Sequence, residues 1–149
     1  MTTIAADDTV LRIERLIATP PERLFEFWTQ PAQIVRWFGP DGCDIPSHDI
    51  DVRPGGAWRI TMHSAEGGTR TVSGVYRLID RPRKLVFTWG WDDDKGVRGY
   101  ETEVTVTFAA APGGTRLTVL QQHFETLEGR DRHNLGWSSS LNRLERVAK

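Results

Sequence analysis

Cysteine is nearly absent from this sequence, since Cys43 is the one cysteine in 149 residues. A single cysteine excludes an internal disulfide and a thiol-rich metal site. An excess of one charge is missing as well, because 19 Lys and Arg stand against 20 Asp and Glu, for a formal net charge of -1. Without a cationic excess, we expect no nucleic acid and no anionic membrane surface as partners.

Long apolar runs are also missing, so no membrane-inserted segment is predicted. Residues 1–8 contain neither the basic segment nor the apolar stretch of a signal peptide. The composition, 38% hydrophobic and 26% charged, is typical of a globular protein. No polar linker divides the chain, and we therefore expect residues 1–149 to form a single soluble domain in the cytoplasm.

The motifs that anchor several enzyme classes are absent too. The sequence has no GxSxG, no Walker loop and no GxGxxG, and its four histidines lack the HExxH spacing. Asp92, Asp93 and Asp94 are contiguous rather than alternate, so they indicate a hairpin tip and not a calcium loop. We therefore expect no metal and no cofactor, and no catalytic residue is assigned.

What the sequence does contain is one strand followed by two helix starts. Alternating apolar residues predict a strand over Val10–Ile17. The segment Thr19-Pro20-Pro21-Glu22 then has the pattern of a capping box, in which Thr19 accepts from the first-turn amides. A second short helix is predicted to begin at Pro31 and to stop at Gly39-Pro40.

The middle of the chain is β-rich, and its C-terminal part is helical. Alternation predicts strands over residues 44–52, 58–63, 72–79, 85–91, 104–108 and 117–123. From about residue 130 to 147, helical spacing of apolar residues predicts a long helix that buries Trp137, Leu141, Leu144 and Ala148. This order predicts an α+β fold in which a curved antiparallel sheet wraps the last helix.

Six tryptophans are many for 149 residues, and four of them, Trp58, Trp89, Trp91 and Trp137, are predicted to point inward. Such rings interdigitate less tightly than Leu or Val, so a curved sheet that holds several of them often retains a pocket. The alternative, in which the rings fill the core, stays open.

Few polar residues accompany these rings. His133 lies one turn before Trp137 on the same helix face, where the helix N-terminus disfavours protonation, so a neutral imidazole is predicted. A surface position for His133 is equally compatible with the pattern. Gln121 and His123 share the inward face of the last strand, whereas His63 is expected on the wet face of its own. The candidate ligand-binding residues are Trp37, Trp58, Met62, Trp89, Trp91, Gln121, His123, His133, Trp137 and Leu141.

Five segments also resemble, in order, a known family. They are Arg15–Phe25, Trp37–Pro40, Pro54–Trp58, Gly113–Thr118 and His133–Leu144. Together they resemble the SRPBCC (START and Bet v 1-like) superfamily, in its bacterial branch named after the activator of the heat-shock-protein-90 ATPase. The resemblance extends over nearly the whole chain, from about residue 9 onward.

The resemblance implies a helix-grip fold, with six to seven strands, two short helices and a long C-terminal helix over a deep hydrophobic cavity. It also implies homology to lipid-transfer, plant-allergen-like and polyketide-cyclase domains. It carries no catalytic residue set. Many members of the branch have His where this chain has Gln121, and this departure weakens any enzymatic function inferred from them.

Three functions follow as hypotheses. The first is binding of a small hydrophobic or aromatic molecule, by a carrier, a sensor or a sequestering protein. The second is a cyclase, hydratase or hydrolase in which His133, His123 or Gln121 moves a proton or orients a water. The third is a chaperone partner, for which we expect no binding, because 149 residues leave no room for the second domain of the eukaryotic activators. A homodimer stays open.

Overall fold

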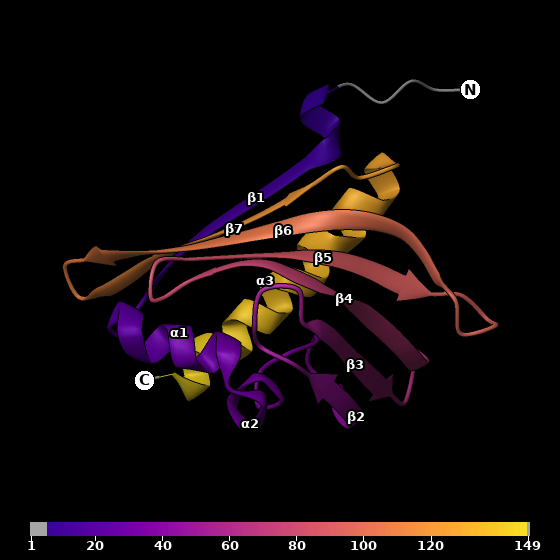
Figure 1. The fold of residues 1–149 in the computed structure, drawn as a ribbon, viewed down its shortest axis with the longest axis horizontal. Helices are drawn as coiled ribbons and strands as arrows, with labels where there is room; N and C mark the ends of the chain where they lie inside the picture. The colour runs from indigo at the N-terminus through magenta and orange to yellow at the C-terminus, as the bar shows by residue number, and fades with distance from the viewer. Residues whose placement is uncertain (1–5, 149) are drawn as a thin grey trace.

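The computed structural model describes residues 6–148, and its elements follow the predicted order (Figure 1). The strands are β1 Val10–Ile17, β2 Asp44–Ile50, β3 Ala57–Ser64, β4 Gly68–Asp80, β5 Lys84–Asp92, β6 Arg98–Ala111 and β7 Gly114–Gln122. The helices are the short 3-10 helix η1 Ala6–Thr9, α1 Pro21–Thr29, α2 Pro31–Ile34 and α3 Leu127–Val147.

The seven strands form one antiparallel sheet in the order β1-β7-β6-β5-β4-β3-β2. The strands β1 and β2, which are successive in sequence, are therefore the two edges of the sheet, and the chain crosses between them through α1 and α2. Figure 1 shows the sheet curving with α3 running diagonally across it. The α+β helix-grip fold predicted from the sequence is confirmed.

The first helix begins one residue later than the capping pattern predicts. Its N-cap is Pro20, with no side-chain cap, and it ends before Pro31, because a residue preceding proline avoids helical dihedrals. The prediction that Thr19 caps this helix is wrong. The Thr19 hydroxyl instead donates to the carbonyl of Ala148, one of the carbonyls left unpaired at the end of α3.

The last helix carries the predicted apolar stripe. The hydroxyl of Thr126 caps its start by accepting from the Gly129 amide at 3.0 Å. Along the helix, the predicted residues of the stripe are all buried: Trp137, Leu141, Leu144 and Ala148. No helix of the described part of the chain is long and apolar enough to cross a membrane.

Aromatic rings fill one end of the space between the sheet and the helices. The rings of Trp28 and Trp37 are 4.5 Å apart between centroids, and Trp28 also stacks on Trp137 at 5.9 Å. Trp58 meets Phe87 edge-on at 5.7 Å. A void of about 30 Å³ lies beside Trp28, Trp37, Trp58 and Phe87, and a larger space lies at the end of the sheet toward the first half of α3.

Candidate ligand-binding pocket

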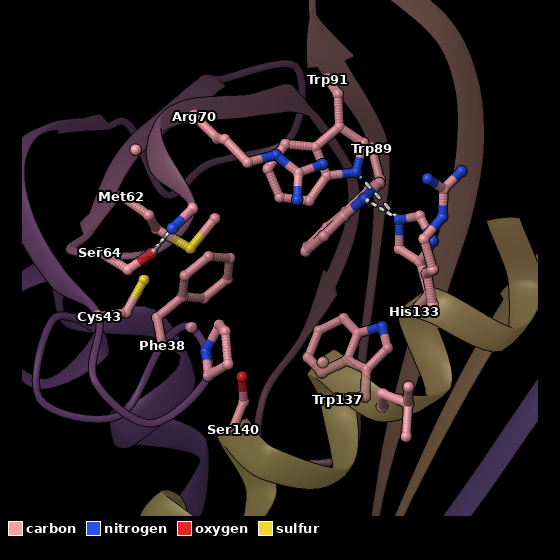
Figure 2. A pocket seen from close by; sticks show the side chains of 17 residues that line it. Phe38, Cys43, Met62, Ser64, Arg70, Trp89, Trp91, His133, Trp137 and Ser140 are labelled. Atoms are coloured by element: carbon pink, nitrogen blue, oxygen red, sulfur yellow. Dashed lines mark hydrogen bonds between the residues drawn. The ribbon is translucent and has the colours of Figure 1, made fainter.

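A pocket of about 650 Å³ opens between four segments of the fold. Its walls come from the first half of α3, the adjoining ends of β3 and β4, the end of β5, and the loop of residues 38–43. Figure 2 shows Phe38, Trp89, Trp137 and Ser140 around its empty centre. The volume lies within the range of about 300–1,000 Å³ that holds small organic ligands.

Two tryptophans of β5 are held by one histidine of α3. Trp89 and Trp91 are two residues apart, so they share one face of the strand. Both indole N–H groups donate to Nε2 of His133, at 3.1 Å and 3.0 Å, as the dashed lines in Figure 2 mark. An atom that accepts two N–H donors carries no proton of its own.

The other ring nitrogen of His133 is also occupied. Its Nδ1 lies 2.6 Å from the carbonyl oxygen of Gly129, which can only accept, so Nδ1 carries the proton. His133 is therefore a neutral imidazole of fixed tautomer. Burial is the main cause that lowers its pKa, and the nearby charges of Arg70 and Arg132 lower it further, against the opposing effect of the Gly129 hydrogen bond.

The predicted neutral state of His133 thus agrees with the structure, but the main cause differs from the one proposed. Burial, and not the helix N-terminus, dominates the shift of the pKa. The expectation that His133 is available to a substrate is not met, because both of its ring nitrogens already have protein partners. The imidazole of His133 is therefore part of the pocket wall and has no ring nitrogen left to bind a ligand.

Trp137 is fixed by a second polar residue beneath it. Its indole N–H donates to Oε1 of Gln121 at 2.8 Å, and Nε2 of Gln121 donates to the Thr102 hydroxyl at 2.7 Å. Gln121 is fully buried, with 0% of its surface exposed. Both ends of its amide are thus used inside the protein, and its function in the structure is to orient the indole of Trp137.

The loop of residues 38–43 forms the opposite wall and is bound to α3. Nη1 of Arg143 lies 2.9 Å from the carbonyl oxygen of Gly39 and within 3.3 Å of those of the two flanking residues, 38 and 40. The amide of Asp41 donates to the Ser139 hydroxyl at 2.9 Å. Gly39 has a φ of 91°, a conformation that favours glycine. These bonds hold the loop in place beside the helix.

Polar groups without partners also face the pocket. The hydroxyl of Ser140 has no hydrogen-bond partner among the described residues and points toward the centre of the pocket in Figure 2. Arg70 and Arg132 are exposed lining residues. The thiol of Cys43 lines it too, and burial raises the pKa of this thiol, which keeps it protonated and poorly nucleophilic.

The structure brings half of the predicted site residues together. Met62, Trp89, Trp91, His133 and Trp137 all line the pocket. They come from β3, β5 and α3, which are distant in sequence, and the inward faces predicted for these elements are the faces that meet.

The other predicted site residues lie elsewhere. Trp37 and Trp58 are in the filled core, where their N–H groups donate to the backbone carbonyls of Phe27 and Thr88. Leu141 and Gln121 are fully buried outside the pocket lining.

His123 is the fifth residue outside the pocket. It is exposed and lies past the end of β7, so strand parity does not govern its direction. Its φ of 73° turns the chain toward α3. The placement predicted for this histidine in the pocket is therefore wrong.

Several lining residues were missed by sequence analysis, among them Phe38, Arg70, Arg132 and Ser140. Two of them had a signal in the sequence. Ser140 lies three residues after Trp137, on the same helix face. Arg70 pairs directly with Met62 across the β3–β4 hairpin, and directly paired residues of a sheet share one face. Within residues 6–148, no three His, Cys, Asp or Glu gather as a metal site.

Comparisons with known proteins agree with this architecture. Residues 18–149 match the family described as Activator of Hsp90 ATPase homolog 1-like protein. The crystal structure of the AHSA1 protein from Silicibacter pomeroyi is 37% identical with a TM-score of 0.84, over 92% of this chain and 95% of that one. A protein from Chromobacterium violaceum is 25% identical with a TM-score of 0.82, over 94% of this chain and 96% of that one.

A more distant structure shares the fold alone. The protein from Mycobacterium smegmatis is 22% identical with a TM-score of 0.83, over 97% of this chain and 93% of that one. No curated protein matches the chain. The pocket must therefore be interpreted from its own geometry.

Proposed function

This chain belongs to the family of Activator of Hsp90 ATPase homolog 1-like proteins, and from that premise and the geometry of the pocket we propose that it binds a small hydrophobic or aromatic molecule. Such a protein acts as a carrier, a sensor or a sequestering protein. The proposal depends on one observation, an aromatic wall whose polar atoms are already satisfied within the protein.

The wall consists of Trp89, Trp91 and Trp137, and each indole N–H has a protein acceptor. Because these donors are used, the rings offer the pocket carbon surface and no unmet hydrogen-bonding demand. An apolar molecule that fills the pocket displaces water from this surface, which is favourable at roughly 25 cal/mol per Å² of apolar area buried.

The same observation weighs against the enzymatic alternative. A general base must reach the proton that it abstracts, and His133 has both ring nitrogens engaged. Gln121 lies under Trp137 and His123 outside the pocket. The three residues on which a cyclase or hydrolase mechanism depended are thus unavailable in this geometry, and no observation favours that function as a second candidate.

The proposal is tested by titrating the purified protein with a panel of aliphatic and aromatic ligands. We expect saturable binding by calorimetry, accompanied by a change in tryptophan fluorescence. Trp91→Phe removes an indole of the wall and should reduce the fluorescence change. Trp58→Phe is the matched control, because it removes an indole of the filled core and should preserve the change. A panel in which no member binds would refute the proposal.

A further inference from the structure

Arg70 is an exposed arginine placed over an aromatic ring. Its guanidinium carbon lies 4.2 Å from the ring centroid of Trp91, and Figure 2 shows the guanidinium against that ring. No carboxylate or hydrogen-bond acceptor within residues 6–148 pairs with it. The ring contact positions the cation at the pocket while its N–H groups remain unused, which leaves them available to an anion.

Arg132 is a second cation of the same pocket that has no carboxylate partner among the described residues. It directly precedes His133 in α3 and lines the pocket. The adjacent carboxylate of Asp131 is already bound to Arg130 at 3.2 Å. Most other arginines of the described chain have carboxylate partners, and of the five that have none, Arg70 and Arg132 are the two that line the pocket.

The two charges belong to one pocket, because Arg70 and Arg132 both line it. Both positive charges also lower the pKa of His133, which lines the same pocket. Of the described residues that line the pocket, none is an Asp or a Glu. A concave site with apolar walls and charge of one sign focuses its field on a ligand of the opposite sign.

An aromatic wall alone would also suit a cationic ligand, since indole faces attract cations. Here the face of Trp91 is already taken by Arg70, and the lining residues that the structure describes offer no carboxylate to neutralise a bound cation. A quaternary ammonium or an amine would therefore meet repulsion. The arrangement therefore favours an anionic ligand.

We propose that the ligand of this pocket is an amphipathic anion, whose carboxylate binds Arg70 and Arg132 and whose apolar or aromatic body lies against Trp89 and Trp137. The proposal rests on the ligand-binding function above and specifies the chemical class. The hydroxyl of Ser140, which has no partner among the described residues, can donate one hydrogen bond to a polar substituent on the body.

The test compares four ligands with the same ten-carbon chain by calorimetry: decanoate, decyl phosphate, decanol and decyltrimethylammonium. We expect decanoate to bind about tenfold more tightly than decanol, because a guanidinium–carboxylate contact is charge-assisted. The ammonium should bind more weakly than decanol. Raising the ionic strength should weaken decanoate binding and leave decanol unchanged. The ratio of decyl phosphate to decanoate distinguishes a phosphate head group from a carboxylate.

Arg70→Gln and Arg132→Gln should each reduce the affinity for decanoate severalfold and leave that for decanol unchanged. Arg83→Gln is the control, since Arg83 is exposed, lies outside the pocket and gives the same change in net charge. Arg70→Lys keeps the charge but loses the planar fork, and should restore part of the affinity.

Equal affinities for decanoate and decanol would overturn the anion proposal and leave the binding function intact. Tighter binding of the ammonium would overturn it as well. If no ten-carbon ligand and no member of the aromatic panel binds, both proposals fail. If Arg83→Gln loses as much decanoate affinity as the two pocket variants do, that result would contradict a specific contact of the carboxylate with Arg70 and Arg132.

Discussion

The two ends of the grip contain the same residue type and differ in what surrounds it. At the filled end, Trp28, Trp37 and Trp58 lie on other rings, beside a void of about 30 Å³. At the hollow end, Trp89, Trp91 and Trp137 have one side on protein and another toward the pocket. Tryptophan is thus core filling in one place and a binding wall in the other.

Hydrogen bonding separates the two ends as well. Every indole N–H at the hollow end has a side-chain acceptor, either His133 or Gln121. At the filled end, Trp37 and Trp58 donate to backbone carbonyls, and the N–H of Trp28 is buried without a partner among residues 6–148. Rings enclosed by other rings are held by packing, whereas rings beside a pocket need polar side chains to orient them.

The largest expected effect is a loss of stability when a ring of the filled end is removed. Trp37→Ala removes a side chain that is 1% exposed and leaves a cavity among rings, so the free energy of unfolding should fall by about 3–5 kcal/mol. Trp91→Ala, at the hollow end, should cost clearly less, since one side of that ring already faces the pocket. Urea denaturation of both variants measures the difference. Equal losses would mean that the two ends are packed alike.

A smaller loss of stability is expected when the hydrogen-bond acceptor of the hollow end, His133, is removed. His133→Ala leaves the N–H groups of Trp89 and Trp91 without their acceptor, and should reduce the free energy of unfolding by about 2 kcal/mol. His63→Ala is the matched control, because His63 is exposed on the other face of the sheet, and it should change stability by less than about 0.5 kcal/mol. A His133→Ala variant as stable as His63→Ala would contradict the stabilising role assigned to His133 as the acceptor for Trp89 and Trp91.

Protonation of His133 gives a third, pH-dependent contrast. Its pKa in the folded protein lies below the ordinary value of 6.5, so the unfolded chain binds the proton first as pH falls. The contribution to stability is complete above about pH 6.5 and is lost as pH falls from there through the lowered pKa. Denaturation midpoints between pH 7.5 and 5 should therefore decrease, and less steeply in His133→Ala. An unchanged slope in that variant would exclude His133 as the source.

The smallest effect concerns Gly136, which lies in the middle of α3 and lines the pocket. A Cβ placed there meets no atom within 4 Å. Alanine at a helix interior is favoured over glycine by roughly 0.5–1 kcal/mol, so Gly136→Ala should raise the melting temperature slightly. Differential scanning calorimetry measures the shift, and a lower melting temperature would indicate that the space is not open.

Much of this fold is predictable because its signals are local. Alternation in β3 and β5 and the stripe of α3 fix which side chains point inward, and the hairpin turns fix which strands are neighbours. The Thr19 prediction failed because the Thr19 hydroxyl donates to a distant residue, the carbonyl of Ala148, and the local pattern cannot reveal that contact.

The pocket itself is less predictable from the sequence. Pointing inward does not reveal whether a ring meets another ring or empty space, and the same pattern describes Trp58 and Trp89. The outcome depends on α1 and α2, which place Trp28 and Trp37 over one end of the sheet and leave the other end open. Only the assembled fold contains that information.

The central claim is that the space beside Trp137 binds the ligand, and one pair of variants tests it directly. Gly136→Leu places a larger side chain into the pocket from a position with room for it, while Gly136→Ala adds one carbon at the same site. Calorimetric titration with the tightest ligand of the panel should show binding lost in Gly136→Leu and retained in Gly136→Ala, with both proteins folded. Undiminished binding by folded Gly136→Leu would contradict the account.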